Sequence, residues 1–333
     1  MGIRKRIAVT LPVPPGIEAS LERARWAEDN GFDDVWFADS AGPDALTLAA
    51  TIGAITKRVR IGTAIIPVFT RTPAVFAATA YALNHVTQGR FILGLGSSSQ
   101  TMMKDWNGLE FEKPLTRVKE TAILVRQMLT GERTDFDGTT LRSHGYRQAP
   151  LDPGAVPIYL AGLRPKMLAL AGEIGDGVIL NLFPTSALPK IVEAIDEGAR
   201  RVGKRASDRE VVCRHQVIVT DDKPAAREAF RRAFAPYYAT PVYNQFLAWC
   251  GFEEVADAIS AGWAERDRAK TTGAMSDELV DEIAIIGTRE ECQERIRGLA
   301  AGGVDTHIIA SPIIDLPVLD ATFEAFSAAH FSF

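Results

Sequence analysis

The stretch Phe91-Ile-Leu-Gly-Leu-Gly-Ser-Ser-Ser99 decides the fold class of this chain. Its apolar first half is typical of a strand buried in a parallel sheet. The glycines that follow allow a turn and a close approach to the backbone, and the serines supply hydrogen-bond donors. Ligands of parallel α/β folds bind beyond the carboxyl ends of the strands, so the stretch indicates a binding site. A tight turn that merely caps the strand explains the same residues equally well.

Strand and helix patterns alternate along almost the whole chain. Strands are predicted at residues 7–11, 35–37, 61–66, 91–95, 156–161, 177–181, 211–220 and 306–310. Strand–helix pairs at this spacing predict an α/β protein with a TIM (β/α)8 barrel, formed as a single domain over residues 1–333. A doubly wound open sheet is the alternative.

Two segments interrupt this rhythm. Residues 134–141 predict a β-hairpin with an Asp137-Gly138 turn, inserted before the fifth strand. Residues 236–283 are less regular and rich in tyrosine and tryptophan, which predicts a helical insertion after the seventh strand. The helix over 74–86 is apolar nearly all round, and with the apolar tail Phe323–Phe333 it predicts a homodimer interface.

Composition excludes several classes of partner. The net charge of −5 gives no basic field that would attract nucleic acid or an anionic membrane. No apolar run approaches the roughly 20 residues that a membrane-spanning helix needs, and prolines break the apolar stretch behind the basic N-terminus. Three cysteines without a CxxC pair favour a reducing, cytoplasmic location. The five histidines are dispersed, so no metal site is expected.

Four motifs together resemble a known family. They are Gly31-Phe-Asp-Asp-Val-Trp-Phe-Ala-Asp39, Ile61-Gly-Thr-Ala-Ile-Ile-Pro67, Gly89-Arg-Phe-Ile-Leu-Gly-Leu-Gly-Ser97 and Ile158-Tyr-Leu-Ala-Gly162. Their order and spacing are similar to those of the bacterial luciferase-like oxidoreductases, and most similar to the branch that uses coenzyme F420, a deazaflavin. The resemblance implies hydride transfer between this cofactor and a small organic substrate. An FMN-dependent monooxygenase and a non-catalytic flavin-binding protein of the same family are the alternatives.

The resemblance assigns the ring of the cofactor to the ends of the early strands. Asp39 follows the second strand and is the candidate catalytic carboxylate, although a turn or cap role also suits it. Ser40 is a candidate contact beside it. The Ala64-Ile65 peptide is expected to be cis and to form a bulge behind the ring. Ser97, Ser98 and Ser99 are expected near the polar edge of the ring.

Ser40 and Ser99 also narrow the range of expected substrates. Sugar-phosphate dehydrogenases of the family carry a histidine and a glutamate at these two positions. Because this chain has serine at both, glucose-6-phosphate oxidation is not expected.

The turn after the fifth strand is the candidate phosphate site. Free N–H groups at a helix start attract anions. The resemblance implies that Gly162, Leu163, Arg164 and Pro165 hold the cofactor phosphate, with an ordinary loop as the alternative. Gly94-x-Gly96-x-x-Ser99 lacks the third glycine of a dinucleotide fingerprint, which argues against nicotinamide. His144 after the hairpin and Tyr237 in the late insertion are candidate substrate contacts.

Overall fold

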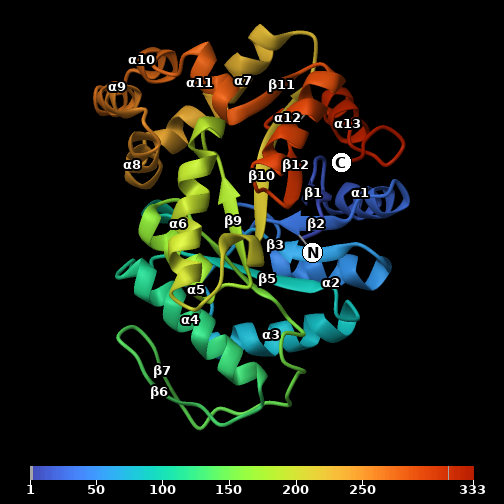
Figure 1. Ribbon diagram of the computed structural model, residues 1–333, viewed down its shortest axis with the longest axis vertical. Helices are drawn as coiled ribbons and strands as arrows, with labels where there is room; N and C mark the ends of the chain where they lie inside the picture. The colour runs from blue at the N-terminus through green and yellow to red at the C-terminus, as the bar shows by residue number, and fades with distance from the viewer. Residues whose placement is uncertain (1–2, 314) are drawn as a thin grey trace.

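Parallel strands close into a barrel with helices around it (Figure 1). The computed structural model describes residues 3–313 and 315–333. β1 (Arg6–Leu11) pairs with β2 (Asp34–Phe37) on one side and with β12 (Thr306–Ala310) on the other, and this closes the sheet. The remaining barrel strands are β3 (Arg60–Thr63), β5 (Phe91–Gly96), β8 (Ile158–Ala161), β9 (Gly177–Asn181) and β10 (Glu210–Val219). The predicted TIM barrel is confirmed, and the open sheet is excluded.

Helices cover the outside of the barrel. They are α1 (Ile17–Asp29), α2 (Ala45–Ile55), α3 (Pro73–Val86), α4 (Pro114–Leu129), α5 (Pro165–Ile174), α6 (Leu188–Arg200), α12 (Arg289–Ala301) and α13 (Leu316–Glu324). Local sequence sets several of their starts, because the side chains of Asp44, Thr72 and Thr288 each accept a hydrogen bond from a backbone N–H of the first turn.

The third predicted strand is interrupted at its carboxyl end. β3 stops at Thr63, the Ala64–Ile65 peptide is cis as expected, and pairing resumes in β4 (Ile66–Pro67). Gly94 of β5 makes room for this bulge, since a Cβ there would lie 1.7 Å from the Thr63 carbonyl oxygen. The Gly94 N–H also donates to Thr63 Oγ1 at 2.8 Å. This glycine therefore serves a contact inside the protein rather than the approach of a ligand.

The hairpin differs from its predicted turn. β6 (Asp135–Asp137) pairs with β7 (Arg142–His144) across a loop of four residues, so the two-residue Asp137-Gly138 turn is wrong. The carboxylate of Glu120 in α4 explains the longer loop, because it accepts hydrogen bonds from three consecutive N–H groups at Thr139, Thr140 and Leu141.

The segment after β10 forms a helical layer on one side of the barrel (Figure 1). It consists of α7 (Lys223–Tyr238), α8 (Pro241–Trp249), α9 (Glu253–Ala264), α10 (Arg268–Gly273), α11 (Asp277–Ile283) and β11 (Ala284–Gly287). β10 continues past its pairing with β9 to pair with β11, and Ile218 of this extension belongs to the same buried cluster as Phe230 and Leu247. The layer thus begins earlier than the predicted residue 236.

The two apolar segments predicted at a dimer interface pack largely within the same chain. Phe76, Ala77 and Ala80 of α3 are buried, and so are Phe323 and Phe331 of the tail. Exposed large apolar side chains remain only singly along these segments. These two segments therefore do not support a homodimer, which remains a prediction. None of the described helices has the length and apolar character needed to cross a membrane.

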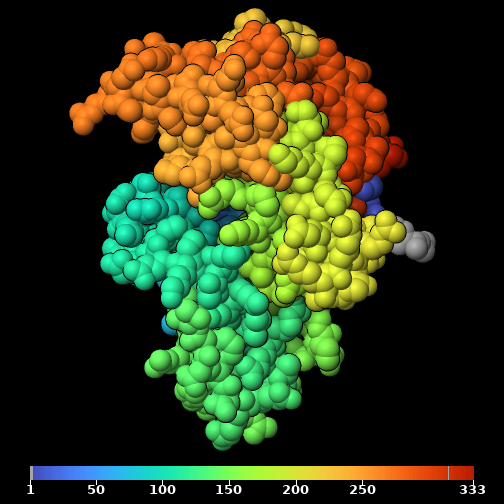
Figure 2. All heavy atoms as spheres, turned by 60° about the vertical axis from the view of Figure 1, so that its left-hand side comes forward, coloured from blue at the N-terminus to red at the C-terminus, as the bar shows by residue number. Residues whose placement is uncertain are grey.

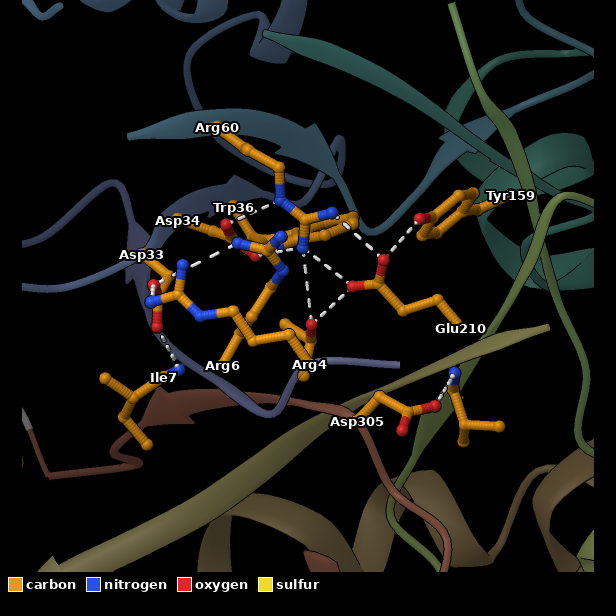
Figure 3. Close-up of polar contacts among 12 residues, drawn as sticks. Arg4, Arg6, Ile7, Asp33, Asp34, Trp36, Arg60, Tyr159, Glu210 and Asp305 are labelled. Atoms are coloured by element: carbon orange, nitrogen blue, oxygen red, sulfur yellow. Dashed lines mark hydrogen bonds and ion pairs between the residues drawn. The ribbon is translucent and has the colours of Figure 1, made fainter. Parts of the chain in front are cut away.

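An ionic network closes the amino-terminal end of the barrel (Figure 3). Arg60 at the start of β3 forms ion pairs with Asp34 at 2.6 Å and with Glu210 at 2.7 Å. The Tyr159 hydroxyl donates to the other oxygen of Glu210 at 2.7 Å. Above it, an apolar inner cluster fills the lumen, formed by Ala8, Trp36, Ile92, Tyr159, Ile179, Val212 and Ile308. Paired and packed side chains thus occupy this end of the barrel, so we place the candidate site at the other end.

Candidate active site

The predicted site residues gather at the carboxyl ends of the strands. Asp39 follows β2, Ala64 follows β3, Ser97 follows β5 and Gly162 follows β8. Because these strands are parallel, all four residues lie at one end of the barrel. Figure 2 shows a hollow in the surface between the helical layer after β10, drawn in orange, and the chain near residue 100, drawn in cyan-green. We call this end the mouth.

The Asp39 carboxylate is held by a neighbouring cation. Asp39 Oδ2 forms an ion pair with Arg71 Nη1 at 2.6 Å, and Arg71 also pairs with Asp44. Among the residues that the structure describes, the other oxygen, Oδ1, accepts only a long 3.5 Å contact from the Ala45 N–H. The Asp39 N–H donates to the Ile65 carbonyl at 3.2 Å, which ties the end of β2 to the bulge. Asp39 is therefore fixed in orientation and keeps one oxygen with spare capacity.

The bulge forms a small apolar floor at the mouth. Ala64, Ile65 and Ala161 are half-buried and pack on the inner cluster. A Cβ at Gly96 would lie 2.9 Å from Ile65 Cγ1 and 3.3 Å from Ala161 Cβ, so this glycine too is filled by protein atoms. Such a floor can support one face of a planar ring.

The three serines differ in their contacts. Ser99 Oγ accepts from the Met102 N–H at 3.2 Å and its carbonyl accepts from the Met103 N–H, so Ser99 starts the π-helical turn Thr101–Trp106. Ser98 adopts a positive φ of 61° with its hydroxyl against the sulfur of Met102. Ser97 makes one hydrogen bond, to its neighbour's carbonyl. Ser97 thus keeps the most hydrogen-bonding capacity for a ligand.

The turn between β8 and α5 has unpaired backbone donors. In the described part of the chain, the N–H groups of Leu163, Arg164 and Lys166 make no hydrogen bond to backbone or side chain. Pro165 has no N–H, and the Arg164 side chain reaches Gln245 of α8. A helix N-terminus with free N–H groups is a ready anion site.

Gly162 itself does not fit its predicted role as a phosphate donor. Its N–H already donates to the Ile179 carbonyl at 3.1 Å. A Cβ there would also lie 3.1 Å from the backbone of Leu168, so the glycine is needed for α5 to pack against β8.

A cation that the sequence patterns did not single out lies inside the mouth. Arg214 of β10 is half-buried, and its Nε donates to Thr10 Oγ1 at 3.4 Å. Burial lowers the pKa of its guanidinium, and the nearby hydroxyls of Tyr237 and Tyr243 oppose this effect. Tyr237 is half-exposed on α7 and packs edge-on against Tyr243 of α8 at 5.9 Å between ring centroids. The structure therefore brings Tyr237 to the mouth.

A family comparison covers most of the chain. The model of the luciferase-like monooxygenase family matches residues 3–306. The chain belongs to the luciferase-like family. A putative coenzyme F420-dependent oxidoreductase of Mycobacterium tuberculosis is 33% identical to it over 325 residues, which cover 90% of this chain and 91% of the relative.

The chain is also similar to other proteins in sequence or in fold. A 5,10-methylenetetrahydromethanopterin reductase of Methanolobus tindarius is 32% identical, covering 87% of this chain and 89% of the relative. The solved coenzyme F420-dependent tetrahydromethanopterin reductase of Methanopyrus kandleri superposes with a TM-score of 0.82 at 21% identity, covering 99% of this chain and 100% of that one. Monooxygenases share the fold at TM-scores of 0.68 to 0.70.

Two of the residues predicted for this luciferase-like protein, Ser40 and His144, are exposed. Ser40 is exposed beside Asp39. His144 is exposed on the hairpin, where its Nδ1 lies 2.9 Å from Asp135 Oδ1, and Figure 1 shows the hairpin projecting beyond α4, away from the helical layer after β10. His144 is thus held by the hairpin's own carboxylates.

No group of metal-ligating side chains is present among the described residues.

Arg214 was missed although the sequence carries a signal for it. Alternate residues of the strand over 211–220 face the lumen, and Val212 lies in the inner cluster. A charged residue two positions later must therefore also face inward. An arginine at an inward position of an otherwise apolar strand is the pattern that would have found it.

Proposed function

We propose that the protein is a coenzyme F420-dependent oxidoreductase that transfers a hydride between the deazaflavin and a small organic substrate. The observation that carries the proposal is the set of unpaired N–H groups at Leu163, Arg164 and Lys166, at the same end of the barrel as the apolar floor. A ligand with a planar ring and a phosphate matches this combination. The F420-dependent relatives support the choice of cofactor.

The residues of the mouth fit such a cofactor. Ala64, Ile65 and Ala161 would contact one face of the ring. The N–H groups at the start of α5 would hold the phosphate, because they carry the positive end of the helix dipole. The exposed side chains of Arg164 and Lys166 add positive charge beside them.

The protein's own contribution is mainly positioning. The bound deazaflavin would supply the two-electron hydride chemistry. Arg71 fixes the Asp39 carboxylate, and Asp39 Oδ1 would accept a hydrogen bond or a proton from a ligand in the mouth. Tyr237 and Tyr243 would cover the mouth from the helical layer and limit access of water.

An FMN-dependent monooxygenase is the second candidate, because FMN also combines a planar ring with a phosphate and monooxygenases share the fold. Titration of the purified protein with F420 and with FMN separately, followed by fluorescence, decides between them. We expect F420 to bind at least about tenfold more tightly, a difference of about 1.4 kcal/mol. Tighter binding of FMN would replace this proposal with the second candidate. Binding without turnover on any substrate would favour a non-catalytic flavin-binding protein.

The cytoplasmic location and the homodimer belong to the same proposal. Cys213, Cys250 and Cys292 are all free thiols, as expected for a protein of a reducing compartment. Sedimentation velocity at micromolar concentration tests the dimer, and a single monomeric species would contradict it.

A further inference from the structure

Arg214 holds an unusual position for a cation. It projects into the lumen one step above Val212 of the inner cluster, and its Nε reaches across β12 to Thr10 of β1. The guanidinium therefore lies over the interior of the barrel rather than in bulk water.

No opposite charge accompanies this guanidinium. Within residues 3–313 and 315–333, no aspartate or glutamate forms an ion pair with Arg214, and its only side-chain hydrogen bond is the one to Thr10. A desolvated cation without a counter-charge is unfavourable in the free protein. Such a group is typical of a site where a ligand supplies the missing charge.

Neighbouring polar groups also have unused hydrogen-bonding capacity. Asn181 of β9 lies directly opposite Arg214 in the strand register, and its buried Oδ1 has no hydrogen-bond partner among the described residues. Its Nδ2 lies 3.4 Å from the Tyr243 hydroxyl. Gln216 lies two residues beyond Arg214 on the same face of β10, and no described residue pairs with its buried Nε2. Arg214 and the Gln216 amide thus offer unused donors on this part of the barrel wall, and Asn181 Oδ1 offers an unused acceptor.

We propose that Arg214 binds the carboxylate of the substrate, and that the substrate is a small organic acid. A guanidinium matches a carboxylate through paired N–H donors, and the unpartnered Nε2 donor of Gln216 can add to them. A single cation suits a monoanion better than a phosphate. The rings of Tyr237 and Tyr243 would contact the apolar body of this acid. The assignment as substrate rests on the proposed function, whereas the carboxylate site itself does not require the cofactor.

Benzoate binding to the cofactor-free protein tests the site by isothermal titration calorimetry, with benzyl alcohol as the neutral analogue. We expect Arg214→Gln to weaken benzoate binding about tenfold to a hundredfold, the loss typical of a charged hydrogen-bonded pair. Benzyl alcohol binding should stay within about twofold, because it makes no contact with the charge. Arg142→Gln on the exposed hairpin is the matched control and should bind benzoate like the unsubstituted protein.

F420 titration of the same variants separates a substrate carboxylate from an anionic group of the cofactor. We expect Arg214→Gln to keep F420 affinity within about threefold. Loss of F420 affinity with unchanged benzoate binding would assign the cation to the cofactor and overturn the proposal. Equal benzoate binding by Arg214→Gln and by the unsubstituted protein would also overturn it, as would the absence of benzoate binding in both. If F420 fails to bind at all, the proposed function fails while the benzoate result remains decisive for the site.

Discussion

Two inward-facing arginines at opposite ends of one barrel lie in contrasting surroundings. Arg60 at the amino-terminal end is paired with Asp34 and Glu210, and the network includes the Tyr159 hydroxyl (Figure 3). Arg214 at the mouth has no described carboxylate beside it. The same residue type therefore completes a closed structural network at one end and leaves charge unmatched at the other. The difference separates the end that maintains the fold from the end that we assign to ligands.

The largest expected effect is on stability at the closed end. Arg60→Met would leave Asp34 and Glu210 without their cation, and we expect a loss of about 3–5 kcal/mol in the free energy of unfolding. Urea denaturation measures it. Arg214→Met is the matched variant, and it should lose less than about 1 kcal/mol or gain stability, since it removes an unpaired charge. Equal losses of unfolding free energy in the two variants would contradict the contrast between a paired Arg60 and an unpaired Arg214.

The pH dependence of the free energy of unfolding should also arise at the amino-terminal end of the barrel, where the ionic network lies. Burial favours a neutral Glu210, but Arg60, Thr306 and Tyr159 outweigh it and lower the pKa of Glu210 to about 2. Because the folded pKa lies below the unfolded value, Glu210 contributes stability above about pH 4.5 and loses it as the pH falls toward 2. We expect this contribution to be about 3 kcal/mol.

Urea denaturation between pH 6 and pH 2.5 measures this dependence, with Glu210→Gln as the comparison. The variant should show a shallower decline over that range because residue 210 no longer titrates. Parallel pH profiles would show that Glu210 is not the titrating group.

A smaller effect is expected at the start of α5. Lys166→Gln removes an exposed charge beside the unpaired N–H groups, so F420 affinity should fall by no more than about fivefold, or about 1 kcal/mol. Arg164→Gln provides the comparison, because the Arg164 side chain is already engaged by Gln245 and should matter less. Fluorescence titration measures both, and a greater loss in Arg164→Gln would show that the Arg164 side chain leaves Gln245 to bind the ligand.

The smallest effect is expected on the hairpin. His144→Ala should leave the KM for substrate within about twofold, as for most exposed positions away from a site. Its neighbours Asp135 and Asp137 raise the pKa of His144, which stabilises its charged form on the hairpin. Steady-state kinetics measures KM, and a large increase would show that His144 contacts the substrate.

The sequence predicted the mouth better than the closed end. Parallel topology alone places the residues after consecutive strands at one end, so Asp39, Ala64 and Ser97 could be grouped before any coordinates were known. The ionic network could not be predicted this way, because Arg60 and Glu210 are 150 residues apart in the chain and share no local pattern. Their meeting depends on closure of the barrel.

Glycines show a second limit of sequence interpretation. A glycine permits a close approach to its backbone, but the sequence does not show whether a ligand or another part of the protein approaches. Gly94 and Gly162 were expected to admit a ligand, and the structure instead fills their space with Thr63 and Leu168. A Gly162→Val variant would therefore disturb the packing of α5 and would not isolate phosphate binding.

A crystal structure of the protein with bound F420 tests the central claim most directly. We predict that the ring of the deazaflavin lies against Ala64 and Ile65 and that its phosphate accepts hydrogen bonds from N–H groups of Leu163, Arg164 or Lys166. A cofactor bound away from the mouth, or a phosphate that makes no contact with the start of α5, would contradict the account.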